Sequence, residues 1–144
     1  LKAISNYDNN YKLMIIGKGN DESRLRTLSK SLGVDKKIIW LQETKEPERY
    51  MCAFDIFLLA SKCEGFGIVA LEAQANGLSV IASDVLPKEI KATDNIQLVS
   101  VKDRKAWINA ILNAKRNVIC KLTEEYEEDN MAKKLEKIYE GILV

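Results

Sequence analysis

The stretch that decides the fold runs from residue 61 to residue 77 and reads SKCEGFGIVALEAQANG. An apolar run, DIFLLA at residues 55–60, leads into it, and a second apolar run, SVIA, follows at residues 79–82. Between them lie a polar turn, two glycines and an apolar segment that Asn-Gly ends. This order predicts a strand, a turn, a helix and another strand, with the glycines where the first strand meets the helix.

The junction between this strand and this helix is suited to an anion. In an open parallel sheet the loops that follow the strands face the ligand crevice. The start of a helix offers unpaired backbone N–H groups and the positive end of the helix dipole. Gly65 and Gly67 let a ligand approach the backbone closely. The sequence therefore predicts a phosphate-type site at this loop.

Two glutamates make the prediction more specific. Glu64 lies just before the glycines, and Glu72 lies inside the helix, about 8 Å along its axis from the start. Helical side chains lean toward the N-terminus, so the Glu72 carboxylate can reach toward a ligand there. Repulsion disfavours contact between a carboxylate and phosphate, so the hydroxyls of a ribose are its natural partner. Outside such a motif each glutamate would be expected simply to be solvated.

These residues resemble the donor-site signature of retaining glycosyltransferases with the GT-B fold, and most closely glycosyltransferase family four. The resemblance rests on EGFGIV at 64–69, LEA at 71–73 and ANGLSVIASD at 75–84, and it extends from about residue 11 to about residue 114. It implies an α/β fold, a Rossmann-like open parallel sheet of about five strands with helices on both faces. Such a domain is the C-terminal, donor-binding half of a GT-B enzyme.

The resemblance also implies roles for individual residues in the motif. Glu72 would hold the ribose, and Glu64, the predicted catalytic residue, would hold hydroxyls of the donor sugar. Gly65, Phe66 and Gly67 would supply backbone N–H groups to the diphosphate or the sugar, while the ring of Phe66 would pack rather than stack on the ligand.

Further predicted donor-binding residues lie earlier in the chain. The Gly-x-Gly at Gly17 and Gly19 carries little weight alone, because Glu22 replaces the third glycine of the dinucleotide fingerprint. In the family this loop lines the donor crevice, whereas Lys18 is expected to be solvated. Thr44 would contact the nucleobase, although a plain surface role for it is at least as well founded. The chain departs from the family at Gln42, where relatives usually have glycine.

Composition excludes several function classes. The chain has 144 residues, 47% of them apolar and 30% charged, as one globular domain would. The net charge of +1 argues against nucleic-acid binding. The three cysteines have no CxxC spacing and are interpreted as free thiols in a reducing compartment. No apolar run reaches transmembrane length, and no signal peptide is visible.

The chemistry of the chain is restricted by the absence of histidine. Ser-His and Cys-His catalysis and His-bound zinc are therefore excluded in this chain. There is no Asp-x-Asp motif, so the resemblance implies metal-independent transfer in which dipoles and backbone amides stabilise the leaving diphosphate. No cofactor is expected.

The apolar patterns, turn residues and caps predict further elements along the chain. Asn20 or Asp21 is expected to cap the second element, Asp103 to cap a later helix, and that later helix to bury Trp107, Ile108 and Ile111. The predicted strands are residues 11–16, 37–41, 55–60, 79–82 and 96–99, and the predicted helices are residues 21–31, 46–54, about 68–75, 103–116 and 123–139.

We expect residues 1–144 to be a single C-terminal nucleotide-sugar-binding domain of a longer two-domain protein, because residues 1–6 resemble the last turns of a helix. The implied reaction moves a sugar from a nucleotide-sugar, with UDP as the commonest carrier, to a glycan or lipid-linked acceptor with retention. The acceptor would bind a missing N-terminal domain. The protein would be cytoplasmic, with the full-length form peripheral at the inner membrane face. Alone, this chain is expected to bind nucleotide weakly and to be inactive.

Two alternative functions stay open. One is a GT-B-fold nucleotide-sugar epimerase, and the other is a non-catalytic nucleotide- or partner-binding domain. A glycoside hydrolase with Glu64 and Glu72 as its acid–base pair is disfavoured, since the glycines between them favour phosphate binding. A receiver domain is rejected, because Asp55 precedes its strand instead of following it.

Overall fold

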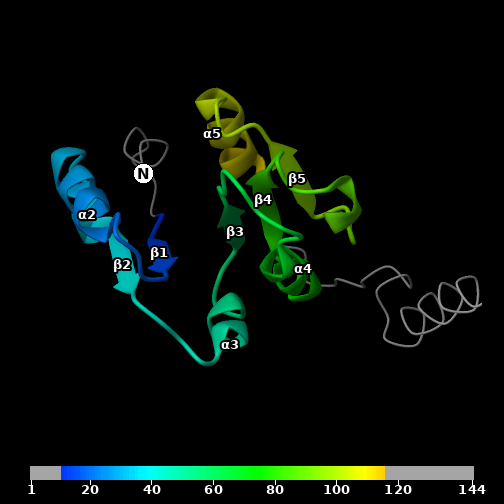
Figure 1. Ribbon diagram of the computed structural model, residues 1–144, viewed down its shortest axis with the longest axis horizontal. Coiled ribbons are helices and arrows are strands. Elements are labelled where there is room, and N and C mark those ends of the chain that lie inside the picture. The colour runs from blue at the N-terminus through cyan, green and yellow to red at the C-terminus, as the bar shows by residue number, and fades with distance from the viewer. Residues whose placement is uncertain (1–10, 116–144) are drawn as a thin grey trace, which may run out of the picture. The chain divides into compact units, whose positions relative to one another are not determined.

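The computed structural model describes residues 11–115. They belong to two compact units, the first ending at Pro47 and the second beginning at Glu48, and each is described by itself (Figure 1). The helix expected at residues 123–139 and the helical turns expected at residues 1–6 lie outside the described residues.

The first unit is a strand–helix–strand unit. Strand β1 (Leu13–Ile16) pairs in parallel with β2 (Ile38–Leu41), with Leu13 opposite Ile38. Helix α2 (Glu22–Ser31) and the short helix η1 (Asp35–Lys37) connect the two strands. This crossover is the connection that parallel strands require.

For helix α2 the predicted end is confirmed, but the predicted N-terminal cap is not. Gly33, at a φ of +68°, follows the helix, and its N–H donates to the carbonyl of Lys30 at 3.0 Å, so the predicted stop is confirmed. The predicted cap is wrong. Asp21 occupies the N-cap position, but its backbone is already helical and no side-chain hydrogen bond caps the helix. Its carboxylate instead accepts hydrogen bonds from Arg24 at 3.0 and 3.1 Å.

The second unit holds a three-stranded parallel sheet in the order β3-β4-β5 (Figure 1). A short helix, α3, precedes β3. The elements are α3 (Pro47–Met51), β3 (Ile56–Leu59), α4 (Ile68–Ala75), β4 (Ser79–Ser83), η2 (Lys88–Ile90), β5 (Ile96–Val99) and α5 (Arg104–Asn113).

Helices cover both faces of this sheet, as predicted. On one face Ala70 and Ala73 of α4 share a buried cluster with Val80 of β4. On the other face Ala110 of α5 packs in a second cluster with Ile81. Val80 and Ile81 are neighbours in one strand, so their side chains point to opposite faces. Consecutive residues of β4 are therefore apolar because both faces of the strand are buried.

Helix α5 confirms one prediction and corrects another. The Asp103 carboxylate accepts a hydrogen bond from the N–H of Ala106 at 2.9 Å, so the predicted cap is present. Trp107, predicted to be buried, is only half-buried, with its indole N–H donating to the carbonyl of Ser100 at 2.9 Å. Ile108 and Ile111 are also half-buried. The fully buried residue of this helix is Ala110, because a small side chain permits the close approach to the sheet.

The prediction of an α/β, Rossmann-like fold with parallel strands is confirmed. Within residues 11–115, β1 pairs with β2 in the first unit, and β3, β4 and β5 pair in the second. Local apolar runs determine that each strand exists. Which strand edges pair is decided by contacts between distant segments, which a local pattern does not contain.

Candidate functional site

The sequence motif lies at the carboxyl edge of the three-stranded sheet. Strand β3 ends at Leu59, and α4 begins at Ile68. Leu59 is paired with Ala82 near the end of β4. Because the two strands are parallel, the loop after β3 and the loop after β4 leave the sheet at the same edge.

Gly67 shapes the start of α4. Its φ of +81° and ψ of 47° are left-handed, and it occupies the N-cap position. A Cβ at this position would overlap the side chain of Leu86, which is buried in the loop after β4. By contrast, a Cβ at Gly65 would have no atom within 4 Å. Both conformation and space therefore require glycine at position 67, whereas position 65 is sterically free.

The backbone of this turn presents donors. The N–H of Ala70 donates to the carbonyl of Gly67 at 2.8 Å, which closes the first turn of α4. Among the hydrogen bonds of the described residues, none comes from the backbone N–H groups of residues 65–68. Such N–H groups at a helix start attract an anion. These N–H groups are the donors that the predicted anion site at Gly65, Phe66 and Gly67 would use.

Glu64 is exposed on the loop before the glycines. Its carboxylate accepts a hydrogen bond from the hydroxyl of Ser61 at 3.1 Å. The sequence did not indicate this contact, although Ser61 belongs to the same polar turn. The hydroxyl restricts the carboxylate while leaving acceptor positions open to a ligand.

Glu72 lies on the side of α4 that faces away from the core. The helix buries Ala70, Ala73 and Gln74. Glu72 is exposed, as is Ile68 one turn earlier, with 66% of its surface accessible. Within residues 11–115 no hydrogen bond or ion pair involves the Glu72 carboxylate. It is therefore accessible to solvent one turn behind the helix start.

One side-chain prediction at the motif is wrong. Phe66 was expected to pack, but it is 40% exposed and belongs to neither buried cluster. The apolar side chains of Leu86 and Leu59 approach the neighbouring Gly67 instead.

The remaining predicted site residues belong to the first unit. The N–H of Gly17 donates to the carbonyl of Leu41 at 2.9 Å, and the carbonyl of Gly19 accepts from the N–H of Glu22 at 3.1 Å. Thr44 is half-buried, and its hydroxyl oxygen accepts from the N–H of Glu46 at 3.1 Å. These three residues form one group, on the loops that follow β1 and β2.

An ion pair joins those two loops. Lys18 donates to Glu43 at 2.8 Å, and both side chains are more than two-thirds exposed. Lys18 is solvated, as expected, but it also has a carboxylate partner that the sequence did not reveal. A pair this exposed contributes little to stability.

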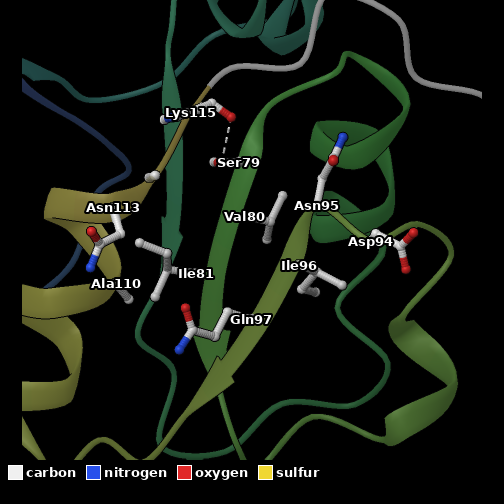
Figure 2. Close-up of a pocket in the computed structure, with 11 residues that line it drawn as sticks. Ser79, Val80, Ile81, Asp94, Asn95, Ile96, Gln97, Ala110, Asn113 and Lys115 are labelled. Carbon is white, nitrogen blue, oxygen red and sulfur yellow. Dashed lines mark hydrogen bonds between the residues drawn. The ribbon is translucent and has the colours of Figure 1, made fainter.

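A pocket of about 240 Å³ lies at the opposite end of the three-stranded sheet (Figure 2). It is found where β4 and β5 begin, and its lining includes Ser79, Asp94 and Gln97. The hydroxyl of Ser79 donates to the carbonyl of Lys115 at 2.9 Å. No predicted site residue lines this pocket, so the motif and the pocket are separate features.

Within residues 11–115, no three or more acidic or cysteine side chains gather as a metal ion would need. None of the helices in this part of the chain is both long and apolar enough to cross a membrane.

The fold is an α/β domain with a left-handed glycine turn between two exposed glutamates, Glu64 and Glu72. Residues 1–133 match the family model described as glycosyl transferases group 1, and the chain belongs to this family. The structural neighbours are GT-B glycosyltransferases, which confirms the expected half of a GT-B fold.

Individual relatives agree with this assignment. The chain is 27% identical over 137 residues to an O-antigen biosynthesis glycosyltransferase of Escherichia coli, covering 90% of this chain and 38% of that protein. The structure of the lipopolysaccharide outer core galactosyltransferase WaaB aligns with a TM-score of 0.78 at 21% identity, covering 97% of this chain and 43% of the other.

A third relative has a nucleotide bound. The structure of HepE from Anabaena in complex with UDP aligns with a TM-score of 0.68 at 19% identity, covering 77% of this chain and 33% of the other. This chain thus spans less than half the length of each of these proteins.

Proposed function

We propose that the chain is the C-terminal, donor-binding domain of a glycosyltransferase that takes a sugar from a nucleotide-sugar. The observation that carries the proposal is the motif geometry. Unpaired N–H groups at the start of α4 lie between two exposed carboxylates, Glu64 and Glu72. Family membership supports it, and so does the UDP complex of a structural neighbour.

In this proposal the helix start binds the diphosphate. The N–H groups around Gly65 and Gly67 and the helix dipole stabilise the charge that develops on the leaving diphosphate. Glu72 accepts hydrogen bonds from the ribose hydroxyls, and Glu64, held by Ser61, accepts them from the donor sugar. Transfer proceeds with retention and without a metal ion.

The nucleotide carrier is proposed to be UDP. The acceptor is proposed to be a glycan or a lipid-linked glycan, bound by a domain that is not within these residues. The names of the O-antigen and lipopolysaccharide relatives support that class. The reaction is assigned to the cytoplasm, with the full-length enzyme peripheral at the inner membrane face.

A titration of the chain with UDP, GDP, ADP and CMP by calorimetry tests the proposal. Binding of UDP at least about tenfold tighter than the others, equal to about 1.4 kcal/mol, is the expected result. Binding of none of them by the full-length protein would contradict it. A parallel transfer assay separates an enzyme from a non-catalytic binding domain: the full-length protein should transfer sugar and this chain alone should not.

A further inference from the structure

Gln74 is a fully buried amide on α4. Its side-chain N–H groups donate to the carbonyl of Ile90 at 2.9 Å and to a carbonyl of its own helix at 3.0 Å. Its side-chain oxygen accepts hydrogen bonds from the N–H of Ala92 and the N–H of Thr93, both at 3.1 Å, and from the hydroxyl of Thr93 at 3.2 Å. A buried amide is tolerated only when its partners satisfy it, and this one is satisfied on both sides.

Four of these five hydrogen bonds hold one segment of the chain. The segment, residues 84–93, connects β4 to β5 and contains η2. Gln74 binds its far end, at Ile90 and beyond. Its near end is held elsewhere, because Leu86 is buried against Gly67. The segment is therefore fixed to both ends of α4.

The same segment borders the unpaired N–H groups. Residues 84–87 follow β4 at the edge where the glycine loop follows β3. The side chain of Leu86 lies against Gly67, while Asp84 and Val85, just before it in the chain, are exposed. If the far end of the segment moved, Leu86 would no longer support the left-handed turn that begins α4.

We propose that Gln74 is a positioning residue of the donor site. By holding residues 84–93 against α4, it keeps Leu86 behind Gly67 and the N–H groups of the turn aimed at the diphosphate. This inference rests on the proposed function.

An amide is required here because the position needs donors and acceptors together. In a Gln74→Glu variant the carboxylate can still accept hydrogen bonds from Ala92 and Thr93. It has no proton, however, to donate to the carbonyl of Ile90. No group that hydrogen-bonds to this side chain titrates. Burial and the facing carbonyls raise the pKa of the introduced carboxyl, and its protonated form can donate to Ile90 again. The defect should therefore disappear as the pH falls.

The experiment measures UDP affinity of the full-length protein by calorimetry at about pH 9.5 and about pH 5.5, because the pKa of a fully buried glutamate can rise to about 8–9. Gln74→Glu should bind UDP about tenfold more weakly than wild type at the higher pH and within about twofold of it at the lower. Gln97→Glu, the same change on an exposed strand residue, should match wild type at both. Circular dichroism first establishes that each variant is folded at the titration temperature.

A second variant covers the case in which Gln74→Glu does not fold. Gln74→Met suits the buried position but has neither donor nor acceptor, so it should bind UDP about tenfold more weakly at both pH values, without recovery. Wild-type affinity in a folded Gln74→Glu or Gln74→Met variant, even with a lower melting temperature, would overturn the inference and leave the proposed function standing. Absence of UDP binding by wild type itself would overturn both.

Discussion

Gly67 combines two requirements in one residue. Its φ is +81°, and any Cβ would overlap the side chain of Leu86. We expect Gly67→Ala to lower the free energy of unfolding by about 2–4 kcal/mol, from left-handed strain and overpacking together. Urea unfolding of the chain measures this change.

Gly65→Ala is the matched control, since nothing lies within 4 Å of the added methyl group. It should change the free energy of unfolding by less than about 0.5 kcal/mol. Equal destabilisation by the two substitutions would show that the turn at Gly67 is not shaped as described.

Glu64 and Glu72 are proposed to hold different parts of the donor, so their variants should differ. Glu64→Ala removes a contact to the sugar, and Ser61→Ala removes the hydroxyl that holds it. Glu64→Ala should lower the affinity for the nucleotide-sugar about tenfold and leave UDP affinity within about twofold, with Ser61→Ala intermediate. Calorimetry with UDP and a panel of UDP-sugars measures the split. Equal losses for UDP and UDP-sugars would place Glu64 beside the nucleotide instead.

Some residues of the site could be predicted from the sequence, and others could not. The glycine at position 67 and the exposure of Glu72 follow from local rules, namely a strand-to-helix turn and an amphipathic helix. The approach of Leu86 to Gly67 joins residues that are distant in the chain, and no local pattern contains that contact. Gln74 could have been recognised from the sequence, because it is a polar residue on the same buried side of the helix as Ala70 and Ala73.

At the scale of elements, two aspartates in similar sequence positions behave differently. Asp103 caps α5 through the N–H of Ala106, whereas Asp21 precedes α2 and binds Arg24. The backbone conformation accounts for the difference, because Asp103 is non-helical, with a ψ of 85°, while Asp21 is already helical. The local sequence therefore predicts that a capping residue is present, but not which group its side chain binds.

The cap on α5 gives a prediction of its own. Asp103→Ala should lower the free energy of unfolding of the second unit by about 1 kcal/mol, because the Ala106 N–H loses its partner. Asp103→Asn keeps a side-chain oxygen at the same position and should cost less than half as much. Urea unfolding monitored by circular dichroism compares them. Equal losses would assign the effect to charge and not to capping.

At the scale of the whole chain, sequence patterns predicted the class of fold better than its connections. Every strand of the described part begins or ends within two residues of the predicted bounds, because apolar runs bounded by turns are local features. Which strands pair within each unit depends on contacts between distant segments, and that is a non-local property. The family assignment rests on the match of residues 1–133 to the family model.

The central claim is that the start of α4, between Glu64 and Glu72, is the donor site. The most direct measurement is a calorimetric titration of UDP into wild type, Glu72→Ala and Asp94→Ala. Asp94 is a matched control, an exposed acid at the opposite end of the same sheet. The account predicts at least about a tenfold loss of UDP affinity in Glu72→Ala, from the lost ribose hydrogen bonds, and wild-type affinity in Asp94→Ala. Unchanged affinity in Glu72→Ala would contradict the account and place the nucleotide elsewhere.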